Sequence, residues 1–193
     1  INISDNPHFI FVDGVLMGKE MTTIVYCDYS KSGDYSIPNT VTTICAGAFL
    51  GCLELNSIVI PDSVTSIGDE AFLRCDHLQS ITIPNSVVSI GSRAFQCCAQ
   101  LSSIEIPNSV REIGDEAFAY CWEMELITIP GSVEILGANL FNVCNKLSEI
   151  TVAGEGGNIR MVDSVLFCKG MTHFIWCSRN KSGSYEIPNT VKT

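Results

Sequence analysis

The chain has 193 residues, of which 46 % are hydrophobic, and a formal net charge of -10 at pH 7. This hydrophobic content is enough to build a core. The acidic balance repels phosphate backbones and anionic lipid head groups, so nucleic acid and membrane surfaces are disfavoured as partners. No apolar run is long enough for a membrane-spanning helix, so we expect no membrane insertion by this segment.

The first element in chain order is a longer unit over residues 5–36. It alternates apolar and polar residues and has turn signals at Asp13-Gly14 and Gly18. The run from Thr22 to Tyr26 is rich in β-branched and aromatic residues, which favours a strand. We expect this unit to be a hairpin-like insert in a larger stack.

Residues 37–151 contain five repeats of 23 residues. Each repeat carries a proline in an Ile-Pro-x-x-Val frame: Pro38, Pro61, Pro84, Pro107 and Pro130. Phenylalanine recurs with the same period, at Phe49, Phe72, Phe95, Phe118 and Phe141, and so does cysteine, at Cys52, Cys75, Cys98, Cys121 and Cys144. A fixed period of this length indicates a solenoid, in which each unit contacts only its neighbours.

Within one repeat the spacing of apolar residues predicts the direction of each side chain. Ile58 and Ile60 lie two positions apart, so both point to the same side of a strand. Pro61 lacks an N–H group and ends that strand. Phe72 then begins a series of inward residues at spacings of three.

The segment between the strand and the phenylalanine carries a glycine and a short acidic run. We expect Gly68 to supply a backbone angle that other residues resist. Residues 69–72 contain acids followed by alanine, which predicts a single helical or 3₁₀ turn.

A second long unit over residues 155–186 repeats the first with a shift of 150 positions. Residues Val12 to Leu16 match Val162 to Leu166, and Lys31-Ser32-Gly33 matches Lys181-Ser182-Gly183. Residues Ile187 to Val191 then open a further repeat. We therefore interpret residues 1–193 as one solenoid fragment of a longer chain.

The spacing of the cysteines indicates buried free thiols, in preference to a metal site or a framework of disulfide bonds. Five of them form a column among apolar residues, and no Cys-x-x-Cys pair exists. The three histidines fall at unrelated repeat positions, so we expect no metal site and no cofactor. Cys45, in the place of a glycine, and Cys97, beside a column cysteine, are the better candidates for oxidation.

The repeat resembles the BspA-like leucine-rich repeats, also described as the Treponema pallidum type. The segment from Ile83 to Phe95 is a close example, with Ile-Pro-x-Ser-Val-x-x-Ile-Gly-x-x-Ala-Phe. The resemblance covers nearly the whole chain and departs from the pattern locally, as at Cys45 and Met124. It implies an α/β solenoid, a curved right-handed stack with a parallel β-sheet on the concave face and short helical turns on the other side. It also implies an extracellular or cell-surface location and a role in adhesion.

The outward positions of the predicted sheet are the first candidate binding surface. They are rich in hydroxyl groups and suit either a shallow groove for a ligand or a plain solvated strand: Ser57, Val59, Ser80, Thr82, Ser103, Glu105, Leu126, Thr128, Glu149 and Thr151. A second candidate is an aromatic patch of Tyr120 and Trp122, which could anchor a partner or pack on the adjacent repeat.

Three classes of function follow from this organisation. We expect an adhesin-type module that binds a protein ligand, such as a host matrix or cell-surface protein. The alternative is an architectural spacer with no ligand of its own. An enzyme is disfavoured, because equivalent positions of the repeats bring together no catalytic Ser/His/Asp or Cys/His set.

Overall fold

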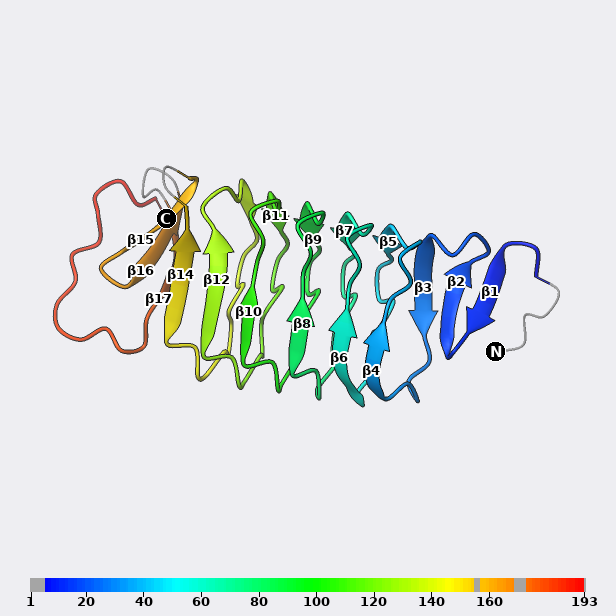
Figure 1. Cartoon of the computed structure of the whole chain (residues 1–193). Coiled ribbons are helices and arrows are strands. Elements are labelled where there is room, and N and C mark those ends of the chain that lie inside the picture. The colour runs from blue at the N-terminus through cyan, green and yellow to red at the C-terminus, as the bar shows by residue number, and fades with distance from the viewer. Residues whose placement is uncertain (1–5, 155–156, 169–172, 193) are drawn as a thin grey trace.

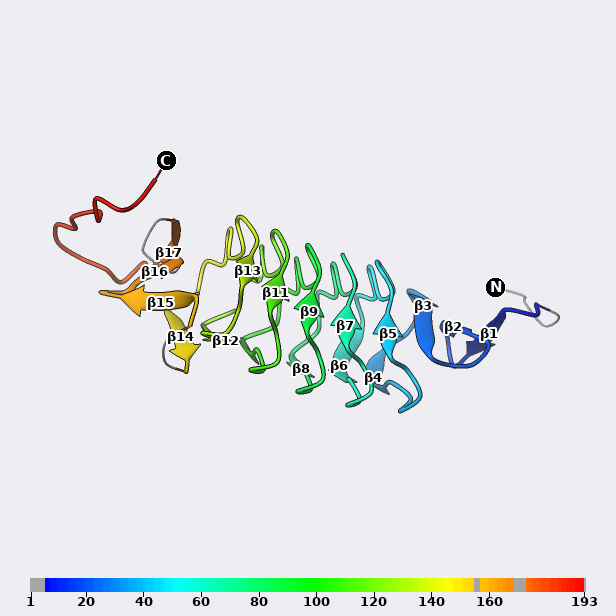
Figure 2. The ribbon, with the colours of Figure 1, turned by 90° about the horizontal axis from the view of Figure 1, so that it is seen from above.

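The structure is a computed structural model that describes residues 6–154, 157–168 and 173–192, and it forms an elongated stack of coils (Figures 1 and 2). The first strand, β1, and the last strand, β17, lie at opposite ends of the stack (Figure 1). Among the described residues there is no helix, and so none that could cross a bilayer. The predicted starts of the two long units, residues 5 and 155, lie outside the described residues.

Each repeat contributes one strand to each of two faces. The long-strand face consists of β4 (Gly33–Ser36), β6 (Leu55–Val59), β8 (Ser80–Thr82), β10 (Ser103–Glu105), β12 (Leu126–Pro130) and β14 (Glu149–Ala153). The short-strand face consists of β5 (Thr43–Ile44), β7 (Ser66–Ile67), β9 (Ser89–Ile90), β11 (Glu112–Ile113) and β13 (Ile135–Leu136). Neighbouring strands within a face are parallel where they pair, as with Ile67 and Ile90. The predicted parallel solenoid is confirmed, but the predicted α/β class is wrong, because the described residues form strands and turns without a helix and the stack is a β-solenoid.

Each long unit forms three antiparallel strands at one end of the stack; the first unit continues the sheet of the short-strand face, and the second forms a sheet of its own. The first contains β1 (Phe9–Val12), β2 (Val15–Gly18) and β3 (Thr23–Cys27), and β3 pairs in parallel with β5. The second contains β15 (Ile159–Val162), β16 (Val165–Cys168) and β17 (Phe174–Cys177). The second unit is attached to the repeats through the Asn158 amide, which donates to the Gly131 carbonyl (2.7 Å), so both units belong to the same stack.

Each long unit contains the same kind of lysine contact, to an aspartate and a tyrosine ring. The Lys31 ammonium pairs with Asp13 and lies 4.5 Å from the centre of the Tyr35 ring. In the second unit the Lys181 ammonium lies 2.5 Å from Asp163 and 4.7 Å from the centre of the Tyr185 ring. The shift of 150 positions therefore relates equivalent contacts as well as equivalent sequence.

A column of phenylalanines forms the axis of the core. Phe49, Phe72, Phe95 and Phe118 are fully buried, and Phe141 is 8 % exposed. Successive ring centroids lie 5.2, 5.2, 5.5 and 6.2 Å apart, and the angle between neighbouring rings is 2–15°. Because each ring packs on the ring of the next coil, the aromatic contacts add to the stabilisation from burial. The predicted inward column is confirmed.

The column cysteines are buried free thiols, as predicted. Each of the last four thiols donates a hydrogen bond to the carbonyl oxygen of a phenylalanine in the preceding coil: Cys75 to Phe49 (3.2 Å), Cys98 to Phe72 (3.3 Å), Cys121 to Phe95 (3.2 Å) and Cys144 to Phe118 (3.0 Å). The thiol therefore supplies a donor to a buried carbonyl group, which a purely apolar side chain of the same size could not do.

The predicted helical turn over residues 69–72 is wrong. The Ala71 and Leu73 amides donate to the carbonyls three residues earlier, but the Glu70 and Phe72 amides each donate to the next coil at 2.8 Å. A helix would keep these amides within its own segment. The turns instead place two residues per coil at positive φ, as at Glu70 (57°) and Arg74 (60°). Hydrogen bonds between neighbouring coils thus take the place of the hydrogen bonds within a helix.

The repeated glycine is required by the distance between coils. A Cβ atom on Gly91 would lie 2.5 Å from the backbone nitrogen of Asp69, and equivalent short distances occur at Gly68, Gly114 and Gly137. Gly68 is not among the glycines with positive φ, so the prediction that it supplies an unusual backbone angle is wrong. The backbones of neighbouring coils approach too closely for any side chain.

Replacing Phe95 by Ala should lower the free energy of unfolding by about 3–5 kcal/mol, because it removes one ring from the middle of the stack and leaves a cavity. Chemical denaturation of the two proteins measures this difference. Thr82→Ala, an exposed substitution in the same coil, is the control. A loss below about 1 kcal/mol for Phe95→Ala would contradict the stacked core.

Replacing Gly91 by Ala should destabilise the protein by about 1–3 kcal/mol or more, because the new methyl group forces two coils apart. Gly18→Ala is the matched control, since its Cβ atom would lie 3.9 Å from the nearest atom, on Thr23. Thermal unfolding of both variants gives the comparison. Equal melting temperatures would show that the coils do not constrain this position.

The buried thiols predict a loss of stability at high pH. Burial raises the pKa of Cys75 and Cys98 above the ordinary value of 9.0. Since the unfolded thiols ionise first, the stabilisation is complete below about pH 9 and is lost as the pH rises further. Melting temperatures between about pH 7 and 11 should fall less steeply for Cys98→Ala than for the natural protein. An identical slope would contradict this.

Candidate interaction surface

The ten predicted outward residues lie on the long-strand face and point away from the core. Strand pairing places Ser80 beside Ser57 and Leu126 between Ser103 and Glu149, so the residues form two columns across the coils. The side chains are exposed or, at Ser57 and Thr128, partly exposed. Their predicted direction is confirmed, and the two columns together provide one surface that no other segment of the described chain covers.

Two residues that the sequence prediction missed extend this surface. Asp34 and Ser36 on β4 pair with Ser57 and Val59, so they occupy the same two columns. The Ser57 hydroxyl donates a hydrogen bond of 2.7 Å to Asp34. The prediction assigned this segment to the insert, although Tyr35 and Ile37 precede Pro38 with the spacing that precedes the other prolines.

The long-strand face carries acidic groups and no compensating cations. Its outward positions include Asp34, Glu105 and Glu149, but no lysine or arginine. The repeat arginines lie elsewhere: Arg93, for example, is within 3.2 Å of Glu70 and 3.3 Å of Glu116. The surface therefore has a negative potential that favours cationic partners.

The long-strand face is interrupted once, between β8 and β10. Strands β4, β6 and β8 form one sheet and β10, β12 and β14 another, although the short-strand face is continuous through the same coils. Backbone groups at this seam are left without a partner strand.

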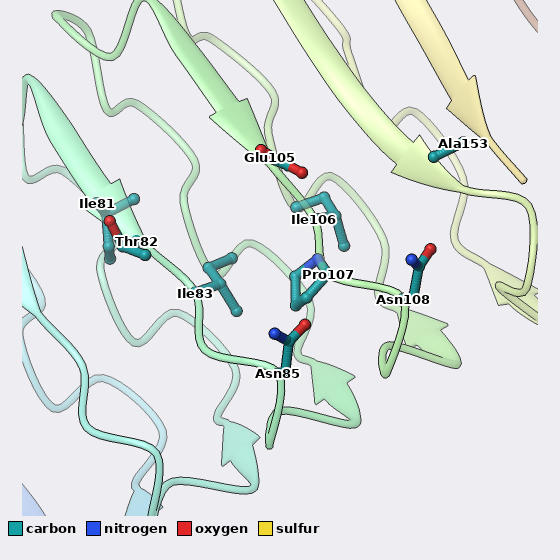
Figure 3. Close-up of a pocket in the computed structure, with 9 residues that line it drawn as sticks. All are labelled: Ile81, Thr82, Ile83, Asn85, Glu105, Ile106, Pro107, Asn108 and Ala153. Carbon is teal, nitrogen blue, oxygen red and sulfur yellow. The ribbon is translucent and has the colours of Figure 1, made fainter.

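A hollow of about 330 Å³ lies beside the seam and extends to Ala153 at the end of β14. Figure 3 shows Ile81, Thr82 and Ile83 on one side and Glu105, Ile106 and Pro107 on the other, with the Asn85 and Asn108 amides at the turns that follow. The isoleucines are at most 9 % exposed, so they form the apolar base of the hollow. Thr82, Glu105, Asn85 and Asn108 are exposed and give it a polar rim.

The predicted aromatic patch lies apart from this face. Tyr120 and Trp122 lie in the turns between β11 and β12, and Tyr120 has φ of 60°. Trp122 is 52 % exposed. The two residues are therefore not brought together with the sheet columns, and they remain a separate candidate surface.

The described residues contain no group of three or more histidine, cysteine or acidic side chains that could hold a metal ion. One thiol–imidazole contact was not anticipated: the Cys168 sulfur lies 3.5 Å from Nδ1 of His173. The Cys168 amide donates to the His173 carbonyl (3.2 Å) and the His173 amide donates to the Cys168 sulfur (3.1 Å). The contact therefore forms part of the hairpin between β16 and β17.

A family model described as BspA type leucine-rich repeat region matches residues 22–168 in six copies. A leucine-rich cell surface protein from Faecalibacterium prausnitzii is 34 % identical, with a TM-score of 0.74 over 78 % of this chain and 41 % of that protein. The leucine-rich repeat protein of T. pallidum is 29 % identical, with a TM-score of 0.64 over 66 % of this chain and 62 % of that one.

The pneumococcal vaccine antigen PcpA shares the fold at 24 % identity, with a TM-score of 0.69 over 79 % of this chain and 38 % of that protein. The chain thus spans less than two thirds of the length of each of these three proteins. The comparison with curated proteins gives no match.

Replacing Trp122 by Ala should change the free energy of unfolding by no more than about 0.5 kcal/mol, because more than half of the side chain is already exposed to solvent. Chemical denaturation alongside Phe95→Ala tests this. A loss above about 2 kcal/mol would show that Trp122 stabilises the contact with the adjacent repeat instead of forming a free surface.

Proposed function

The chain belongs to the BspA-type leucine-rich repeat family, and from this premise we propose that it is a non-enzymatic interaction module of a secreted or cell-surface protein. The observation that carries the proposal is the exposed long-strand face, which repeats two outward columns over successive coils. A surface of this kind suits an extended or protein ligand, because repeat solenoids expose long surfaces instead of closed pockets.

The composition of the face supports binding of modest strength per module. Its outward strand positions contain no tryptophan, tyrosine or arginine, the residues that most often dominate interface energies. Val59 and Leu126 are 57 % and 45 % exposed and provide apolar contact area. Repetition of such modules along a longer protein would increase the overall affinity through avidity.

We propose that the chain acts in adhesion. The similar protein from F. prausnitzii is a cell surface protein, which supports an extracellular or cell-surface location for this chain. We propose a host matrix or cell-surface protein as the ligand. The acidic face favours a partner with a basic contact surface.

Replacing Val59 by Lys should weaken capture of the chain on immobilised extracellular matrix glycoproteins by about tenfold, because it places a cation on the acidic face. Val88→Lys is the matched control, since Val88 is 49 % exposed but lies outside the long-strand face. Surface plasmon resonance at two salt concentrations measures both variants.

Two results would contradict the proposal. Equal loss of capture for both variants would show that the long-strand face is not the contact surface. Absence of capture by every matrix protein and by whole host cells would favour an architectural spacer.

A further inference from the structure

We propose that the hollow at the seam between β8 and β10 binds an arginine side chain of the protein ligand. The inference rests on the proposed function, because it concerns the same face and names the chemical group that the face recognises. Its basis is the coincidence of three features at one place: an interrupted strand ladder, a hollow and an acceptor-rich rim.

The interruption makes this part of the face different from every other pair of coils. Strands on either side of the seam keep their ladders, since Ser57 pairs with Ser80 and Ser103 pairs with Leu126. The short-strand face also remains paired across the same coils, through Ser89 and Glu112. The strand ladder is therefore broken only on the long-strand face, and the exposed residues Thr82 and Glu105 place the rim of the hollow on that face.

The walls of the hollow match the two parts of an arginine side chain. Ile83, Ile106 and Pro107 provide an apolar surface for the aliphatic stem. The Glu105 carboxylate provides two acceptor oxygens, which suit a guanidinium group in a bidentate contact. The Asn85 and Asn108 side chains add carbonyl oxygens at the same rim (Figure 3).

The charges at the site favour an external cation. No lysine or arginine lines the hollow, so no cation of this chain competes for Glu105 there. Glu105 also forms no ion pair among the described residues, in contrast to Glu70 and Glu116, which pair with Arg93. A planar guanidinium group fits this rim better than an ammonium group, since it presents its donors in a fixed fork.

The neighbouring exposed side chains indicate how a peptide would lie. Val59 is in the coil before β8, and Leu126 is in the coil after β10. Both are exposed, and they lie on opposite sides of the hollow. Three strand spacings of about 4.8 Å separate β6 from β12, roughly 14 Å in all. An extended ligand segment covers this distance in about four residues, so apolar residues at i and i+4 with an arginine at i+2 would face the protein together and contact all three positions.

The test uses the blocked pentapeptide acetyl-Leu-Ser-Arg-Ser-Leu-amide, titrated into the ¹⁵N-labelled protein and followed by NMR. We expect saturable shifts of the backbone amides of Thr82, Asn85, Glu105 and Asn108. Glu105→Gln should weaken binding by about tenfold, because it removes the charge and leaves the shape of the side chain almost unchanged. Glu149→Gln, on the same face but outside the hollow, should bind as the natural protein does.

Peptides with citrulline or lysine in place of arginine complete the test. Loss of binding with citrulline and weaker binding with lysine would support the guanidinium site. Equal binding of all three peptides, equal effects of Glu105→Gln and Glu149→Gln, or shifts spread over the whole acidic surface would overturn it.

The outcome can be separated from that of the proposed function. If the chain captures a matrix protein through Val59 but Glu105→Gln has no effect, the arginine site is wrong and the proposed function stands. If the peptide binds at the hollow but no matrix protein or host cell is captured, the hollow is a guanidinium site and the adhesion proposal fails.

Discussion

The close approach of successive backbones is the constraint on which the rest of the structure depends. Amides of one coil donate to carbonyls of the next, and glycines such as Gly91 leave no room for a side chain between them. This spacing is what brings the phenylalanine rings to 5.2–6.2 Å from one another. The stacked rings then bury the largest apolar groups of each coil, so hydrogen bonding and core packing stabilise the same geometry.

The cysteine column follows from the same spacing. A thiol within 3.0–3.3 Å of the phenylalanine carbonyl of the preceding coil both fills space and donates to a buried acceptor. Serine would supply a donor but is more costly to bury, and alanine would supply none. The recurrence of cysteine is therefore explained by packing and hydrogen bonding, without a metal ion or a disulfide bond.

The constraint also determines where binding chemistry can occur. Inward positions, the glycine column and most backbone groups are occupied by contacts between coils, so only the outward side chains are free to differ from one coil to the next. The seam between β8 and β10 is an exception, because no ladder of hydrogen bonds pairs the two strands there. It combines a polar rim with an apolar base in a way that the uniform parts of the sheet do not.

The sequence by itself determined the period, the inward columns and the direction of the outward side chains, because spacings of two and three residues decide which way a side chain points. It did not determine the turn at residues 69–72, where local composition favoured a helix but amides bond to the next coil. It also gave no sign of the partners of the thiols or of the seam. These features depend on the exact distances between atoms of different coils, and an almost unvarying 23-residue repeat carries no information about where the strand ladder is interrupted.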